Sequence, residues 1–343
     1  MSKRQVLIIY TGGTIGMVKS PETNSLVPMD FSNIRNKVPE LQMFDFDVHT
    51  ITFDPPIDSS EMCPTTWAKI AQFISINYAT YDGFVVLHGT DTMSYTASAL
   101  SYMLHNLSKP VVLTGSQLPM GTIRTDGKEN LIAALEIAAA QEHGSAIVPE
   151  VCVFFQSKLF RGNRTTKYNA ENLMAFRSEN YPALAEVGID IKYSYPYIRY
   201  VVSSGKFSVS EKMDTNVAVL KIFPGITRNI VHAFFSVPGL RGVVLETFGS
   251  GNAPTTQWFI DELAEAVQRG IMIVNVTQCM AGSVEMWRYD TGRHLQEIGI
   301  VSGRDMTTEA ALTKLMYLLG NYSDSDEIKM MLNKSLRGEI SIR

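Results

Sequence analysis

Two threonines, each in a tight glycine loop that follows an apolar run, have the type and spacing to do chemistry. Thr14 lies in the loop T-G-G-T-I-G after the run 6–10, and Thr90 lies in the loop H-G-T-D-T after the run 84–87. Open α/β sheets bind ligands in the crevice outside the carboxyl ends of such runs, and the glycines would let a small substrate approach the backbone closely. The pair of hydroxyls predicts nucleophilic chemistry at a shared cleft.

The first loop alone is a weak signal, because glycine turns between a strand and a helix also bind phosphates or simply pack closely. It is neither a G-x-G-x-x-G sequence nor a Walker A loop, since a Lys-Ser/Thr pair is missing. We therefore expect no bound nucleotide.

Two charged residues accompany the threonines, and each has two interpretations. Asp91 lies where a helix over 92–107 is expected to begin, so its carboxylate either caps that helix or holds a substrate ammonium, and these roles are compatible. Lys167 is either a solvated lysine or a desolvated one whose lowered pKa lets it take a proton from a threonine hydroxyl. No Ser-His-Asp or H-E-x-x-H spacing offers a better base, and His88 is expected to be a packed histidine.

The composition favours small-molecule chemistry over binding to nucleic acid or membrane. The 343 residues carry 30 basic and 34 acidic side chains, a net charge of −4, and so present no basic face for a polyanion. No apolar run reaches the about 18 residues of a membrane span. The run 6–10 is also shorter than the roughly 7 to 15 residues of a signal-peptide core, so we expect a soluble, cytoplasmic protein.

The cysteines are odd in number and widely spaced. Cys63, Cys152 and Cys279 form no C-x-x-C pair, which argues against a disulfide framework and a structural zinc site. We expect reduced, mostly packed thiols and no metal site.

Short apolar runs alternate with longer helical periods, which predicts an α/β fold with a parallel sheet covered on both faces. The chain also exceeds the roughly 250–300 residues at which a single core stops growing. We predict an N-terminal catalytic domain at 1–190, a linker at 191–213 where periodicity is lost, and a smaller α/β domain at 214–343. The expected strands are 84–87, 111–113, 151–155, 217–222, 242–245 and 271–276, and the expected helical faces are 67–78, 93–107, 131–138, 258–267 and 312–319.

One stretch fits no element. Residues 16–31 contain Pro21 and Pro28 and show no periodicity. They form either a lid over the candidate nucleophile or a surface excursion.

Together these residues resemble the bacterial-type L-asparaginases, most closely their cytosolic type I branch. The resemblance spans nearly the whole chain and rests on the two threonine loops, on D-S-S at 58–60, on T-G-S-Q at 114–117 and on Lys167. It implies a flavodoxin-like N-terminal domain and a smaller C-terminal α/β domain. It also implies a homodimer, or a homotetramer built as a dimer of dimers, in which subunits complete the site.

The resemblance further implies hydrolysis of L-asparagine without metal or cofactor. Thr14 would attack the side-chain amide carbonyl as the primary nucleophile, supported by a triad of Thr90, Asp91 and Lys167. Lys167 would handle the proton through Thr90. Ammonia would leave from a β-aspartyl ester, which water would then hydrolyse to L-aspartate.

Four further residues match substrate-binding positions of the family. Asp58 and Ser59 would hold the α-carboxylate and ammonium ends of the substrate, although the same residues suit an ordinary Pro-rich turn. Ser116 would line the amide pocket. Asn252 matches an asparagine that reaches a partner subunit's site, although its loop, rich in Gly and Pro, suits a plain turn too.

Two positions depart from the family pattern. Many members have a lid tyrosine where this chain has Leu26, so we expect the lid to exclude water instead of transferring protons. Some cytosolic members bind a second asparagine near the subunit interface through an arginine, and Glu246 takes that place here. We expect no such switch, either because the carboxylate repels the effector or because Glu246 pairs with an Arg or Lys across the interface.

The expected function is that of an amidohydrolase acting on L-asparagine. The alternatives are a glutaminase or another small-amide amidase, an amidase component of a transamidation complex, and a non-catalytic amino-acid sensor.

Overall fold

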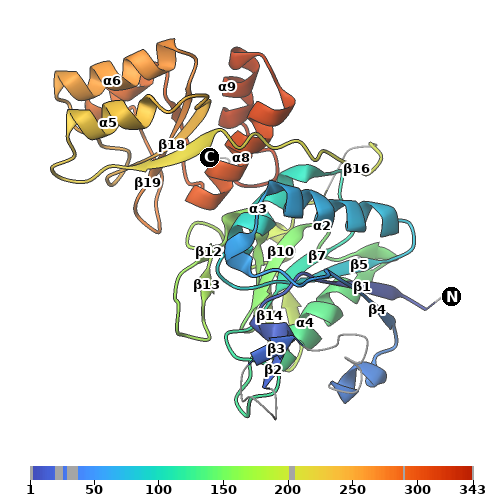
Figure 1. Ribbon diagram of the computed structural model, residues 1–343. Helices are drawn as coiled ribbons and strands as arrows, with labels where there is room; N and C mark the ends of the chain where they lie inside the picture. The colour runs from blue at the N-terminus through green and yellow to red at the C-terminus, as the bar shows by residue number, and fades with distance from the viewer. Residues whose placement is uncertain (1–2, 20–25, 29–37, 201–204, 289, 342–343) are drawn as a thin grey trace. The chain divides into compact units, whose positions relative to one another are not determined.

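The structure, a computed structural model, describes residues 3–19, 26–28, 38–200, 205–288 and 290–341. The chain divides into two compact units, the first ending at Glu211 and the second beginning at Lys212 (Figure 1). Each unit has its own sheet and its own hydrophobic core.

An eight-stranded sheet forms the centre of the first unit. Five strands run parallel in the order β4-β1-β5-β7-β10, which reads 2-1-3-4-5 along the chain, as in flavodoxin-like folds. Three more strands, β11, β14 and β15, continue it in antiparallel pairs. The bounds are β1 Gln5–Tyr10, β4 Asp47–Thr52, β5 Gly83–Leu87, β7 Val111–Thr114, β10 Val151–Phe155, β11 Lys158–Arg161, β14 Ala185–Val187 and β15 Ile191–Tyr193.

Helices cover both faces of this sheet. Figure 1 shows α2 (Pro64–Asn77) and α3 (Met93–Met103) on one face and α4 (Gly127–Ala139) on the other. Every residue of β5, β7 and β10 is buried as a result, and each buried Val, Leu or Phe side chain contributes about 1.5–3 kcal/mol. The three strands predicted at these places are confirmed, and their apolar runs are uninterrupted because neither face meets water.

Short strands hold most of the segment 191–213 within the first unit. β15 pairs with β14 at the edge of the sheet, and β16 (Ser208–Val209) pairs with β6 (Leu104–His105). Residues 191–200 and 205–211 therefore belong to the first unit. Periodicity is lost there because strands of two or three residues are too short to display it.

The stretch 16–31, to which sequence analysis assigned no element, contains two short strands. β2 (Met17–Lys19) and β3 (Leu26–Pro28) pair antiparallel, with Val18 opposite Val27. Three-residue strands leave no recognisable alternation in the sequence, which explains why neither was predicted. The remaining residues of the stretch, 20–25 and 29–31, and the side chain of Leu26 lie outside the described parts.

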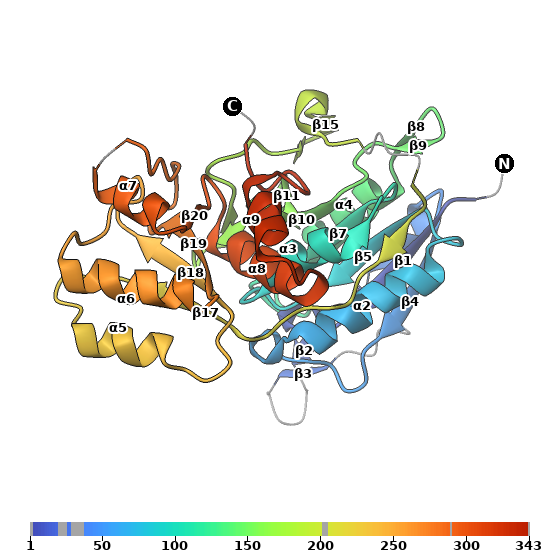
Figure 2. The ribbon, with the colours of Figure 1, turned by 90° about the horizontal axis from the view of Figure 1, so that it is seen from above.

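The second unit contains a four-stranded parallel sheet in the order β17-β18-β19-β20. Figure 2 shows α5 and α6 on one side of this sheet and α8 and α9 on the other. Helix α6 gives way at Arg269 to Gly270, which has a φ of 89° and so suits the predicted C-cap. The bounds are β17 Val217–Lys221, β18 Gly242–Thr247, β19 Met272–Thr277, β20 Val301–Ser302, α5 Arg228–Phe235, α6 Gln257–Gln268, α7 Asp290–Glu297, α8 Thr308–Asn321 and α9 Ser325–Asn333.

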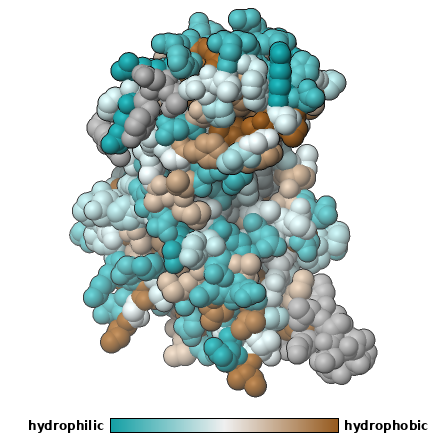
Figure 3. All heavy atoms as spheres, turned by 90° about the vertical axis from the view of Figure 1, so that its left-hand side faces the viewer, coloured by the Kyte–Doolittle hydropathy of each residue, from teal (hydrophilic) through white to brown (hydrophobic). Residues whose placement is uncertain are grey.

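The surface is largely hydrophilic on the face drawn in Figure 3, where hydrophobic side chains lie in small groups among polar ones. Within the described ranges, no helix is both long and apolar enough to cross a membrane. All three cysteines are free, but only Cys152 is buried. Cys63 is partly buried and Cys279 is exposed in a loop, so the prediction of mostly packed thiols is wrong for Cys279.

Candidate active site

The two threonine loops meet where the strand order of the large sheet reverses. β1 and β5 are neighbours in the sheet, and they lead directly into the loops that carry Thr14 and Thr90. The chain continues from β1 to β4 on one side and from β5 to β7 on the other. This reversal is the place where flavodoxin-like sheets bind their ligands.

Glycines let three loops pack backbone against backbone at this point. A Cβ on Gly13, whose φ is 89°, would lie 2.5 Å from the Cα of Gly89. A Cβ on Gly89 would lie 2.5 Å from Oγ of Ser59. Neither position has room for a side chain, so the loops carrying Thr14, Ser59 and Thr90 pack directly against one another.

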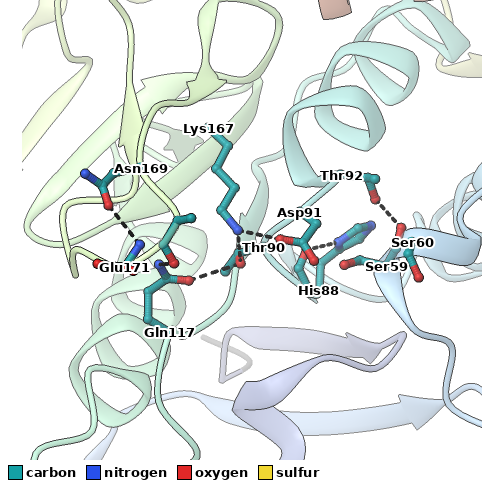
Figure 4. Close-up of polar contacts among 12 residues, drawn as sticks. Ser59, Ser60, His88, Thr90, Asp91, Thr92, Gln117, Lys167, Asn169 and Glu171 are labelled. Carbon is teal, nitrogen blue, oxygen red and sulfur yellow. Dashed lines mark hydrogen bonds and ion pairs between the residues drawn. The ribbon is translucent and has the colours of Figure 1, made fainter.

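Lys167 joins Thr90 and Asp91 through its ammonium group (Figure 4). Nζ donates to Thr90 Oγ1 at 2.8 Å and to Asp91 Oδ1 at 2.5 Å. The Lys167 side chain is 18% exposed, whereas that of Asp91 is 67% exposed. Asp91 therefore keeps an open side toward solvent, and the position before α3 is taken by Thr92, which makes no side-chain cap bond.

The segment before Lys167 is anchored against α3. The short helix η5 (Gly162–Arg164) packs on α3, where a Cβ on Gly162 would come within 3.0 Å of the Cβ of Ala97. Lys167 then pairs with Phe176 in the hairpin of β12 (Thr166–Lys167) and β13 (Phe176–Arg177). This close packing brings the ammonium to the start of α3, next to Thr90.

Gln117 is a residue of this cluster to which sequence analysis gave no role. Thr90 Oγ1 donates to Gln117 Oε1 at 3.1 Å, and Gln117 Nε2 donates to the carbonyls of Ala170 and Asn172 at 3.1 and 3.2 Å. Two carbonyl acceptors require the amide nitrogen, so the oxygen must face Thr90. The hydroxyl proton of Thr90 therefore points to Gln117, and Oγ1 of Thr90 accepts the hydrogen bond from Lys167.

His88 is a packed histidine, as predicted. Nδ1 lies 2.6 Å from the carbonyl oxygen of Gly89, which can only accept, so Nδ1 carries the proton and Nε2 accepts from Thr96 Oγ1 at 2.8 Å. Complete burial lowers the pKa of His88 to about 4. The ring is therefore neutral at physiological pH and holds the peptide before Thr90.

The expected substrate-binding residues of the first unit lie in loops near the same edge of the sheet. Asp58 Oδ1 accepts from the backbone N–H and the hydroxyl of Ser60 at 2.9 and 2.8 Å, and these bonds lower the pKa of Asp58. The Asp58 carboxylate is exposed and charged at neutral pH, while Ser59 is buried and its carbonyl accepts from Thr92 at 2.6 Å. Ser116 is buried, and its hydroxyl donates to the Leu118 carbonyl at 2.6 Å.

Comparison with known proteins identifies the family. The sequence model of the asparaginase N-terminal domain family matches residues 5–199. That of the glutaminase/asparaginase C-terminal domain family matches residues 216–332. The chain belongs to the asparaginase family. It is therefore an enzyme. Both threonine loops lie within the residues that match the N-terminal asparaginase domain.

Individual proteins are similar over nearly the whole of this chain. L-asparaginase 1 of Escherichia coli (strain K12) is 44% identical over 345 residues, which cover 99% of each chain. A 60 kDa lysophospholipase of Mus musculus is 43% identical over 99% of this chain and 63% of its own. The crystal structure of L-asparaginase I from Vibrio cholerae is 40% identical and superimposes with a TM-score of 0.88 over 99% of this chain and 100% of its own.

Two residues singled out from the asparaginase resemblance lie in the second unit. Asn252 forms a turn in which its backbone N–H donates to Phe248 at 2.8 Å. Glu246 accepts from Thr308 Oγ1 at 2.6 Å and lies 3.5 Å from the ammonium of Lys221. The carboxylate of Glu246 is thus paired within its own chain, by the residue opposite it on β17.

Proposed function

We propose that this protein hydrolyses L-asparagine to L-aspartate and ammonia through a threonine-linked acyl-enzyme. The observation that carries the proposal is the 2.8 Å contact between the Lys167 ammonium and the Thr90 hydroxyl at the point where the sheet order reverses. Full-length similarity to L-asparaginases supports the choice of substrate.

Thr14 is the proposed nucleophile. Its hydroxyl attacks the carbon of the substrate's side-chain amide, and collapse of the tetrahedral intermediate releases ammonia and leaves a β-aspartyl ester. Water, activated at the same place, attacks the ester, releases L-aspartate and restores the Thr14 hydroxyl. Each step moves one proton, and Lys167 acting through Thr90 is the proposed carrier.

Asp91 is the proposed link between Lys167 and the substrate. In the free enzyme the Asp91 carboxylate pairs with the Lys167 ammonium. The open side of Asp91 would also accept the α-ammonium of the substrate. One carboxylate would then contact both the substrate and the lysine.

The remaining residues complete the substrate site in this proposal. Asp58 and Ser59 hold the α-carboxylate and ammonium ends, and Ser116 lines the amide pocket. Asn252 enters from a partner subunit, in a homodimer or homotetramer that works in the cytoplasm.

Ammonia release from the purified chain tests the proposal. We expect L-asparagine to yield ammonia and L-aspartate, and Thr14→Ala to abolish both. Faster release from L-glutamine would indicate a glutaminase, and release only in the presence of a partner complex would indicate a transamidation component. Binding of L-asparagine without any ammonia would identify a sensor and contradict the proposal.

A further inference from the structure

A cavity lies wholly within the second unit, built from residues that play no part in the proposed reaction. Its volume is about 520 Å³, within the roughly 300–1,000 Å³ typical of small-molecule sites. The loop 283–287, the end of α7, β20 and α9 form its walls.

Two basic side chains line this cavity without a partner. In the part of the chain that the structure describes, neither the Arg304 guanidinium nor the Lys329 ammonium makes a hydrogen bond or ion pair. The Lys329 ammonium lies against the wall at Gly299, 3.9 Å from where a Cβ of that glycine would be. Backbone bonds hold Arg304 in place, because its N–H donates to Ser302 Oγ and its carbonyl accepts from Val284.

The acidic side chains of the cavity are already occupied. Asp305 Oδ1 accepts the backbone N–H of Ser341 at 3.0 Å, and Glu285 Oε2 lies 3.4 Å from the Arg288 guanidinium. Both carboxylates of the cavity thus have a hydrogen-bond or ion-pair partner, whereas the two basic side chains have none among the described residues. A guanidinium fork and an ammonium group together suit a carboxylate or a phosphate.

The rest of the lining combines polar side chains with an apolar surface that an inorganic ion alone would leave uncovered. Val284, Met286 and Ile300 contribute buried aliphatic surface, and Trp287 adds an indole that is 67% exposed. Large exposed tryptophans commonly supply the flat contact area of binding sites. A ligand with an apolar group next to its charge would cover this surface.

We propose that this cavity binds a small organic anion, whose carboxylate or phosphate contacts Arg304 and Lys329 and whose apolar or aromatic group packs on Trp287. This binding is independent of the amide hydrolysis proposed above. It assigns a ligand site to the C-terminal domain.

Titration of the full-length protein with three probes tests the proposal. Phenylacetate and phenyl phosphate carry the two anionic groups, and benzyl alcohol is their neutral counterpart. We expect at least one anion to bind about tenfold or more tightly than benzyl alcohol, by calorimetry and by a change in tryptophan fluorescence, and to bind more weakly as salt increases. The tighter of the two anions identifies the class of ligand.

Variants locate the binding. Arg304→Gln and Lys329→Gln should each raise the Kd of the tighter anion by about tenfold, as expected for loss of one charge-assisted hydrogen bond. Lys334→Gln is the matched control, since it removes the same charge from an exposed lysine just after α9 that does not line the cavity. Thermal melting checks that each variant is folded.

Two results would overturn the proposal. In the first, both anions bind no more tightly than benzyl alcohol. In the second, Arg304→Gln and Lys329→Gln weaken binding no more than Lys334→Gln does, which would show a general effect of net charge.

Discussion

The Lys167 ammonium donates a 2.8 Å hydrogen bond to the hydroxyl of Thr90, although 77 residues separate them along the chain. The same ammonium lies 2.5 Å from Asp91. One cation thus contacts two of the polar side chains that follow β5, near the loop in which Thr14 is proposed to act as the nucleophile.

Thr14, Thr90 and Lys167 should act as one catalytic unit. Thr14→Ala, Thr90→Val and Lys167→Met should each lower kcat by orders of magnitude, about 10²-fold or more. Because groups that act as a unit are not additive, double variants should be scarcely slower than singles. Steady-state kinetics measures the effect, with circular dichroism to confirm the fold. Near-normal turnover by Thr14→Ala would contradict the nucleophile assignment.

Gln117 should orient the Thr90 hydroxyl. Gln117→Leu removes the acceptor of the Thr90 proton and the two bonds to the carbonyls of Ala170 and Asn172. We expect kcat to fall roughly tenfold to 100-fold with a smaller change in KM, because the lost contacts position the reacting groups. Gln257→Leu, which removes only a surface pair with Asp261, serves as the control. Equal kinetics in the two variants would show that Gln117 is merely structural.

His88 should make stability depend on pH. Burial lowers its pKa from an ordinary 6.5 to about 4. Between these values the unfolded chain binds a proton that the folded protein does not, so the free energy of unfolding should fall as the pH drops from 6.5 to 4. The contribution of this single group is of the order of 3 kcal/mol.

Two histidine variants isolate this contribution. His88→Gln cannot titrate and should lose less stability on acidification than the parent, although it is less stable near neutrality. His49→Gln changes an exposed histidine and should follow the parent. Thermal melting across this pH window measures all three proteins, and parallel curves for His88→Gln and the parent would refute the assignment.

Substrate dependence should be hyperbolic. Thr308 and Lys221 already hold the carboxylate of Glu246. An effector carboxylate placed 4 Å away would be repelled by about 4 kcal/mol at an effective dielectric near 20, which exceeds typical coupling free energies of about 1–3 kcal/mol. Initial rates against L-asparagine should give a Hill coefficient near unity. A clearly sigmoidal curve would show that an effector is held in another way.

Activity should survive removal of divalent metals. Among the residues that the structure describes, no three His, Cys, Asp or Glu side chains cluster in a way that could hold a metal ion. Exhaustive dialysis against EDTA should leave turnover unchanged. Loss of activity that added metal restores would require a metal-assisted mechanism instead.

The sequence by itself determined the core elements and the loops that follow them. β5, β7 and β10 are uninterrupted apolar runs because helices cover the sheet on both faces. Glycines next to Thr14 and Thr90 mark the turns at the ends of β1 and β5. These signals are local, since burial and backbone geometry act on neighbouring residues.

Only the tertiary structure decided which side chains meet. The sequence suggested no role for Gln117. Its contact with Thr90 depends on β5 and β7 being neighbours in the sheet. The pairing of β2 with β3 and of β14 with β15 involves strands too short to leave a period in the sequence. Glu246 acquires Lys221 as a partner because parallel pairing places them opposite each other. Such contacts depend on strand order and register, which join residues distant along the chain.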